Sequence, residues 1–209
     1  MLINLFGTLV YSILYLLFWR LYFQVLGHGK VKGTLPSQPF ILIANHGSYL
    51  DWLLLDALFH KKFGRKIRFV AKSKLMTNPL WRFLIRYRGA IVVDGNASRK
   101  SGEAITDSLR LGEIIAIFPE GTRSPSKKLM NFQKGFAYLA LKTKNPIVPV
   151  GLVGFYDNWP RQCSLPRWRP APMEIRIGSP IEVLISQVNR NTIDSLVDNS
   201  VEHVKKLLD

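Results

Sequence analysis

The chain has 209 residues, 47% of them hydrophobic, which is enough for one domain with a full core and too apolar for a disordered tail. Its formal net charge of +15 indicates an anionic partner, such as a membrane, an acidic substrate or nucleic acid. A single cysteine, Cys163, excludes an internal disulfide.

The first predicted element is an apolar segment over residues 1–26. Leu2 to Trp19 carries no charge, and a helix of this length rises about 27 Å, close to the hydrocarbon thickness of about 30 Å. Aromatic residues gather near its end, as they do at a membrane interface. We expect a membrane-anchoring helix, in preference to a buried core helix or a cleaved signal peptide. The cations after it predict a membrane-associated protein whose domain, residues 27–209, faces the cytoplasm.

Beyond a polar linker, short apolar runs alternate with stretches of helical periodicity. The expected strands are Phe40–Ala44, Ile67–Ala71, Ala90–Val93, Ile114–Phe118, Ile147–Leu152 and Glu174–Ile177. The expected helices are Leu50–Lys62, Pro79–Arg88, Gly102–Leu111, Gly135–Lys144 and Thr192–Leu208. Almost wholly apolar strands are typical of parallel strands buried on both faces. We therefore predict an α/β fold with a mostly parallel central sheet flanked by helices.

Residues with ionisable side chains follow three of these strands. His46, Lys72 and Glu120 each come just after a predicted strand. Open α/β sheets bind their ligands beyond the carboxyl ends of the strands. We therefore expect these side chains to converge at one edge of the sheet.

The first motif runs from Asn45 to Asp51. His46 and Asp51 would face about 140° apart on a continuous helix, but Gly47 indicates a turn, with the helix beginning near Ser48. An aspartate bonded to one ring nitrogen fixes the tautomer and raises the basicity of the other, which makes the pair a candidate general base. Two plainer interpretations stay open: a helix capping box from Ser48 to Asp51, and an ordinary turn histidine.

The sequence contains no serine nucleophile elbow and no group of residues at metal-ligand spacing. Neither a covalent nucleophile nor a metal is therefore expected. A base without a nucleophile suits direct transfer of a group to a substrate hydroxyl.

The second motif, residues 118–124, reads Phe-Pro-Glu-Gly-Thr-Arg-Ser. Gly121 permits a turn that exposes backbone N–H groups, and Arg123 is a bidentate partner for phosphate or carboxylate. Glu120 is expected to orient Arg123 or a substrate hydroxyl. Taken alone, the same residues also fit an ordinary polar turn.

Asn-His-x4-Asp followed by Phe-Pro-Glu-Gly-Thr-Arg-Ser resembles the glycerolipid acyltransferase family, and most closely its 1-acylglycerol-3-phosphate acyltransferases. Gly89 to Asp94 and Pro146 to Val150 resemble two further blocks of that family. The resemblance implies that His46 is the base and Asp51 its orienting partner. The base would deprotonate a lysolipid hydroxyl, which attacks the thioester of acyl-CoA or acyl-carrier protein, with no other cofactor. The residues matched to acceptor binding are Lys72, Glu120, Gly121, Thr122 and Arg123.

One position departs from the family pattern. Its second block usually ends in Asp-Arg, whereas this chain has Asp94 and Gly95, with Arg99 as a candidate substitute four residues later. The expected product is phosphatidic acid. Three alternatives stay open: a different lyso-lipid acceptor, such as a lyso-ornithine lipid or another lysophospholipid, a non-catalytic membrane- or lipid-binding protein, and a thioester hydrolase.

The middle of the chain is strongly basic. Residues 60–100 hold twelve lysines and arginines against one acid, with aromatic residues interleaved. Together with the apolar first segment, this composition predicts docking on an anionic membrane surface. A solvated charged face is the plainer alternative. No nucleic-acid-binding motif is visible, so nucleic acid is not expected as a partner.

Overall fold

The computed structural model describes residue 9 and residues 35–93, 99–167, 171–184 and 187–209. Six strands form one sheet in the order β3-β2-β4-β1-β5-β6. The strands are β1 (Ile41–Ala44), β2 (Ile67–Lys72), β3 (Ile91–Val93), β4 (Ile114–Ile117), β5 (Ile147–Val153) and β6 (Glu174–Ile177). The first five are parallel, and β6 runs antiparallel to β5. The predicted α/β sheet is confirmed, with each strand within one residue of its expected ends.

Each expected helix is present. They are α3 (Asp51–Phe63), α4 (Pro79–Arg88), α5 (Arg99–Arg110), α6 (Gly135–Thr143) and α8 (Arg190–Leu208). Two short elements were not predicted, because neither is long enough to show a helical period: η1 (Ser73–Thr77) and α7 (Phe155–Asn158). Asn78 caps α4 by accepting from the N–H groups of Leu80 and Trp81, as the Asn-Pro sequence predicts.

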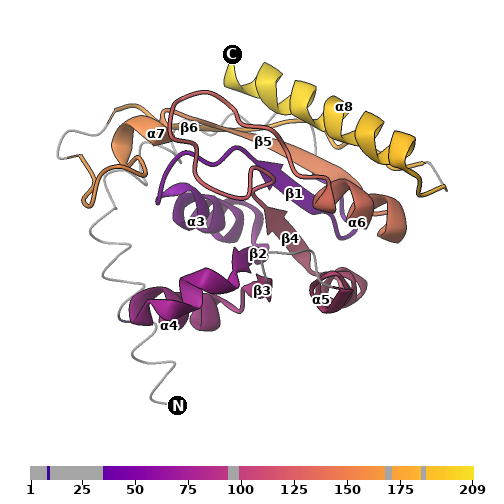
Figure 1. Ribbon diagram of the computed structural model, residues 1–209, viewed down its shortest axis with the longest axis horizontal. Coiled ribbons are helices and arrows are strands. Elements are labelled where there is room, and N and C mark those ends of the chain that lie inside the picture. The colour runs from indigo at the N-terminus through magenta and orange to yellow at the C-terminus, as the bar shows by residue number, and fades with distance from the viewer. Residues whose placement is uncertain (1–8, 10–34, 94–98, 168–170, 185–186) are drawn as a thin grey trace.

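The sheet separates two hydrophobic clusters because successive strand residues point to opposite faces. Leu42 and Ala44 of β1 pack with α3 on one face, and Ile41 and Ile43 pack with α5, α6 and α8 on the other. Figure 1 shows α3 on one side of the strands and the other three helices across the sheet from it. Burial on both faces explains why the central strands are apolar throughout.

The two sequence motifs leave neighbouring strands. β1 and β4 pair in parallel, with Ile43 opposite Ile117, so the residues after both strands emerge side by side at one edge. β2 pairs with the other side of β4 and ends at the same edge with Lys72. The expected convergence of strand ends is therefore present.

Part of the basic middle holds the fold together. Arg68 pairs with Glu113 at 2.6 Å, and Arg88 pairs at 2.5 Å with Asp56, which is buried. Arg65 donates to backbone carbonyls of the segment before β1 and lies over the Phe40 ring. These three arginines face protein groups, whereas other cations of the region are exposed to solvent. The exposed cations with described side chains are Lys61, Lys62, Lys66, Lys72, Lys74, Arg82, Arg86 and Lys100.

The predicted membrane-anchoring helix over residues 1–26 lies outside the described residues, apart from Leu9. In the ranges that are described, no helix is both long and apolar enough to cross a bilayer.

Candidate functional site

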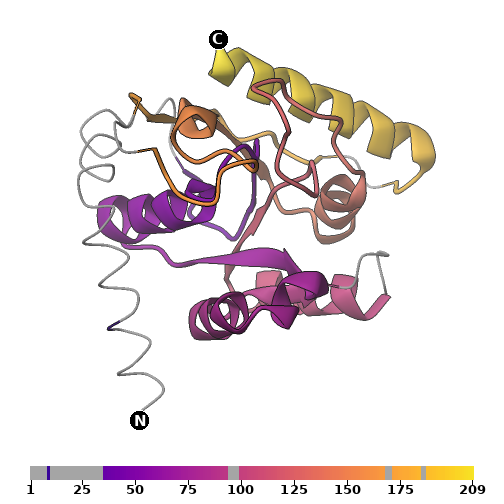
Figure 2. The ribbon, with the colours of Figure 1, turned by 60° about the vertical axis from the view of Figure 1, so that its left-hand side comes forward.

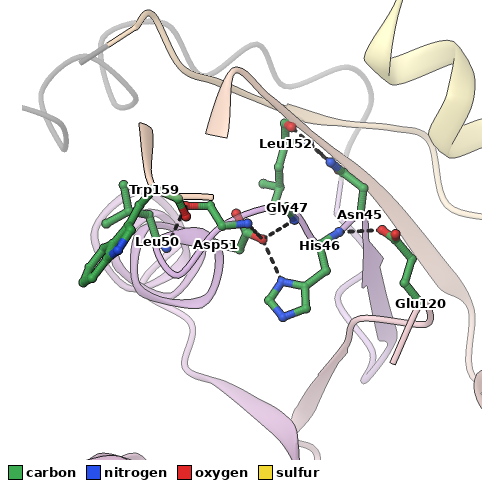
Figure 3. A network of polar contacts seen from close by, with 9 residues as sticks. Asn45, His46, Gly47, Leu50, Asp51, Glu120, Leu152 and Trp159 are labelled. Atoms are coloured by element: carbon green, nitrogen blue, oxygen red, sulfur yellow. Dashed lines mark hydrogen bonds and ion pairs between the residues drawn. The ribbon is translucent and has the colours of Figure 1, made fainter. Parts of the chain in front are cut away.

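The first motif is fixed to the sheet by its first residue. Asn45 follows β1, and its side-chain amide donates to the Leu152 carbonyl at 3.1 Å and accepts from the Leu152 N–H at 2.7 Å. Both bonds tie the end of β1 to β5. In Figure 3 the Asn45 side chain points toward Leu152, and the His46 ring lies on the other side of the loop.

One oxygen of the Asp51 side chain contacts three nitrogens of the turn. Its Oδ2 lies 2.7 Å from His46 Nδ1 and accepts from the N–H groups of Gly47 at 2.8 Å and Ser48 at 2.9 Å (Figure 3). Asp51 is fully buried and is the first residue of α3. The helix thus begins at Asp51 and not near Ser48, but the two side chains meet as predicted. Of the alternative capping box only the bond from the Ser48 N–H to Asp51 is present, because the Ser48 hydroxyl accepts from the Leu50 N–H and the N-cap of α3 is Leu50.

The imidazole is oriented for use as a base. A carboxylate oxygen that accepts from two backbone N–H groups is also an acceptor toward Nδ1, so the tautomer that fits this contact has its proton on Nδ1 and its lone pair on Nε2. The ring stacks on Phe118 with centroids 4.2 Å apart and planes at 15°. Within the described part of the chain, Nε2 has no hydrogen-bond partner, and the His46 side chain is 19% exposed. The basic nitrogen is therefore open to a substrate.

The second motif holds the backbone of His46 on both sides. The His46 N–H donates to Glu120 Oε1 at 2.6 Å, and the His46 carbonyl accepts from the Ser124 N–H at 2.7 Å. The other Glu120 oxygen accepts from the Met130 N–H at 3.1 Å. Glu120 is 4% exposed, so the two motifs are joined by a buried carboxylate.

The surroundings of Glu120 disfavour its charge. Burial raises the pKa of Glu120 to about 7, and the negative charge of Asp51 acts in the same direction. The N–H groups of His46 and Met130 lower the pKa but do not offset the loss of water. Among the described residues Glu120 does not pair with Arg123, which was one of its two expected roles. Its other role, orienting a substrate hydroxyl, stays a prediction.

Gly121 is required by the shape of the second turn. Its φ is +69°, and a Cβ added there would lie 2.6 Å from the Gln133 side-chain nitrogen. Its N–H closes the turn onto the Phe118 carbonyl at 2.9 Å. The positive φ is what favours glycine here, because the end of the flexible Gln133 side chain could move aside for a Cβ.

Arg123 lies on the first motif. Its guanidinium carbon is 3.4 Å from the centroid of the Tyr49 ring, inside the stretch between His46 and Asp51. Thr122, beside it, is exposed. The contact of Tyr49 with Arg123 is not predictable from the sequence, because no local pattern pairs residues 74 positions apart.

The remaining predicted acceptor residues lie nearby in the topology. Lys72 is exposed at the end of β2. Arg99 is the first residue of α5, but its side chain lies outside the described part, as does Gly95. The structure therefore brings His46, Asp51, Glu120 and Arg123 together and places Lys72 at the same sheet edge.

The two bonds that hold the His46 backbone, from its N–H to Glu120 and from the Ser124 N–H to its carbonyl, form a clamp between the motifs. A cavity of about 330 Å³ adjoins this clamp. Glu120, Ser124 and the loop from Ser126 to Leu129 line one side, and the end of β5 with Tyr156 lines another. In the described residues no group of three His, Cys, Asp or Glu side chains is arranged to hold a metal ion.

Comparison with known proteins places this site in a family. The family model described as Acyltransferase matches residues 28–153, which contain both motifs. A 1-acyl-sn-glycerol-3-phosphate acyltransferase of Cocos nucifera is 36% identical over 146 residues, covering 68% of this chain and 46% of that protein. A lyso-ornithine lipid O-acyltransferase of Rhizobium meliloti is 31% identical over 128 residues, covering 59% of this chain and 41% of the relative.

A crystal structure shows the same fold. The 1-acyl-sn-glycerophosphate (LPA) acyltransferase PlsC of Thermotoga maritima matches with a TM-score of 0.61 and 27% identity, covering 97% of this chain and 78% of that one. The chain spans about half the length of the curated relatives named above, 46% and 41%.

The raised pKa of Glu120 predicts a pH-dependent stability. Between 4.5 and about 7 the folded protein keeps a proton that the unfolded chain has released, so the contribution of Glu120 to stability falls as pH rises through this range. The fall is at most roughly 3 kcal/mol and is complete above the folded pKa. Glu120→Gln does not titrate there. The free energy of unfolding of the wild type, relative to this variant, should therefore decrease from acidic to mildly alkaline pH.

Urea titration of both full-length proteins in the same detergent measures this difference. Every other titrating group is shared and cancels. A difference that is independent of pH would show that Glu120 has the same proton affinity in both states. The variant should also be the less stable protein at acidic pH, because the hydroxyl oxygen of protonated Glu120 can still accept from an N–H group, whereas the amide nitrogen of Gln cannot.

Proposed function

Because the chain belongs to the acyltransferase family, we propose that it moves a fatty acyl group from acyl-CoA or acyl-carrier protein to the hydroxyl of a lysolipid. The acceptor that we favour is 1-acylglycerol-3-phosphate, which gives phosphatidic acid. The observation that carries the proposal is the bond between His46 and Asp51, which leaves Nε2 open at the strand ends. The names of the relatives from coconut and Thermotoga support the choice of acceptor.

In the first step His46 Nε2 takes the proton of the acceptor hydroxyl, and the oxygen attacks the thioester carbonyl carbon. A C–O bond forms, and the carbonyl oxygen becomes an oxyanion. Asp51 stabilises the imidazolium through Nδ1, while the stack on Phe118 keeps the ring in place. General-base catalysis of this kind contributes about 10²- to 10⁴-fold in rate.

In the second step the oxyanion collapses and the C–S bond breaks. The leaving thiolate takes the proton from His46 Nε2, which returns the imidazole to its neutral form. The products are the esterified lipid and a free thiol. No covalent enzyme intermediate forms, in keeping with a site that has a base but no activated nucleophile.

The oxyanion needs hydrogen-bond donors, and backbone N–H groups of the second motif are candidates. The N–H groups of Gly47 and Gly121 already bond to Asp51 and Phe118. In the described part of the chain the N–H groups of Thr122 and Arg123 have no partner. We therefore assign the oxyanion to these two groups, each of which is worth about 10²- to 10³-fold in rate.

A second acceptor has specific support. The relative from Rhizobium meliloti is named for lyso-ornithine lipid, and this chain has Gly95 where the family pattern has an arginine. One cation fewer favours an acceptor with less phosphate charge. The chemistry at His46 is the same for either acceptor.

We also propose that the domain rests on an anionic membrane through η1 and α4. Leu75 and Leu80 are 42% and 53% exposed, and Lys74, Arg82 and Arg86 on the same two elements are exposed to solvent. Exposed leucines beside cations suit an interface of acyl chains and anionic head groups. Together with residues 1–26 as the anchor, this surface would place the site at the membrane that carries its substrate.

Replacing His46 tests the catalytic proposal. We expect His46→Ala to lower turnover at least a hundredfold, because the variant lacks the imidazole that Asp51 orients as the proposed base. His203→Ala is the matched control, since His203 lies on α8 and bonds to the Asn199 carbonyl. Its turnover should match the wild type.

The assay uses full-length protein in detergent, labelled acyl-CoA or acyl-carrier protein, and 1-acylglycerol-3-phosphate or lyso-ornithine lipid as acceptor. Substantial turnover by folded His46→Ala would remove His46 as the base. Thioester cleavage that needs no acceptor would instead indicate a hydrolase. Wild-type protein inert with every pair of substrates would indicate a binding protein.

Charge reversal tests the membrane surface. Arg82→Glu with Arg86→Glu should weaken binding to vesicles that contain phosphatidylglycerol by roughly tenfold or more at low salt, because each cation contributes about 1 kcal/mol. The control is Arg190→Glu with Lys205→Glu, which changes the net charge equally on α8. Figures 1 and 2 show α4 and α8 at opposite ends of the molecule. If both double variants lose vesicle binding equally in a flotation assay, the effect comes from net charge alone and not from a surface on α4.

A further inference from the structure

Tyr49 joins the two motifs through its ring. The Arg123 guanidinium lies over it, with Cζ 3.4 Å from the ring centroid. The same ring stacks on Trp81 at 5.9 Å and 15°, and contacts Trp159 at 4.9 Å. The Tyr49 N–H also donates to the Trp159 carbonyl at 3.3 Å. Backbone and ring contacts therefore fix Tyr49 from several sides.

Arg123 is held without being neutralised. Among the described residues it makes no ion pair, and its Nη1 is buried with no hydrogen-bond partner. Glu120, the carboxylate three positions earlier, is occupied by backbone N–H groups. A donor shielded from water and left unpaired is costly, and an anionic oxygen that reaches it removes that cost.

Stacking and ion pairing use different parts of a guanidinium. A carboxylate would occupy the in-plane N–H donors and cancel the charge, whereas an aromatic ring contacts only the flat face. Arg123 on Tyr49 therefore keeps its in-plane donors and its full charge. Tyr49 lies between His46 and Asp51 in the chain, so the cation is fixed relative to the base.

We propose that Tyr49 is a positioning residue, which holds Arg123 by its ring so that the in-plane N–H donors face the anionic group of the acceptor. The proposal rests on the acyl transfer proposed above, in which Arg123 binds that group. A positioning role differs from a role in packing alone. If Tyr49 positions Arg123, removing the ring affects acceptor binding only when Arg123 is present. The aromatic neighbours Trp81 and Trp159 act as the support of the ring.

The test compares Tyr49→Leu, which removes the ring, with Tyr49→Phe, which keeps it. With 1-acylglycerol-3-phosphate as acceptor and an acyl-CoA as donor, Tyr49→Leu should raise the acceptor KM roughly 2- to 30-fold, the range of a cation–π contact. The kcat at saturating acceptor should change little. Tyr49→Phe should restore the wild-type KM, because the ring face and not the hydroxyl contacts Arg123.

A double-mutant cycle separates positioning from packing. Arg123→Gln should raise the same KM, and adding Tyr49→Leu to it should raise the KM no further. If the increases in KM from the two substitutions multiply in the double variant, Tyr49 acts independently of Arg123, and the proposal is overturned. Tyr49→Met serves as the ring-free variant if Tyr49→Leu does not fold.

Failure of the proposed function is distinguishable in the same experiment. Wild-type protein that transfers no acyl group to any lysolipid would remove acyl transfer itself. An active wild type whose KM is unchanged in Arg123→Gln would remove the anion-binding role of Arg123, and the role of Tyr49 with it. An effect of Arg123→Gln without an effect of Tyr49→Leu would overturn the positioning role alone.

Discussion

The site depends on one constraint, the fixing of the His46 backbone by the second motif. Its N–H is held by Glu120 and its carbonyl by the Ser124 N–H, at 2.6 and 2.7 Å. These bonds can form because β1 and β4 are neighbours and both motifs begin where those strands end. The position of His46 is thus set through β1, which precedes it, and through β4, which precedes the second motif.

Orientation of the side chain follows from that fixed backbone. Asp51 Oδ2 binds Nδ1 together with the N–H groups of Gly47 and Ser48, so the oxygen that holds this turn also selects the tautomer of His46. Phe118 supports the ring from the second motif, and Arg123 returns to the first motif by lying on Tyr49. Contacts between the two motifs therefore hold His46, Tyr49 and Arg123 in place, which suits the proposed reaction, because it needs a hydroxyl and a thioester aligned.

Local patterns predicted the strands and the longer helices, because apolar runs and capping residues specify them within a few positions. The pairing of His46 with Asp51 was also predictable, since both lie in one turn. The clamp was not, because Glu120 bonds to a backbone N–H 74 residues away and a backbone group carries no sequence signal. For the same reason Arg65, Arg68 and Arg88 were counted with a docking surface, although their partners are protein groups brought near by the fold.

The protonation state of His46 tests the account most directly. Full-length protein with ¹⁵N-labelled histidine can be studied by NMR at mildly alkaline pH, with the His46 signals assigned from their loss in His46→Asn. Nδ1 should carry the proton and Nε2 should have the shift of an unprotonated nitrogen, a preference that Asp51→Ala should weaken. A proton on Nε2 in the wild type, or a preference unchanged without Asp51, would contradict a base that is oriented by Asp51.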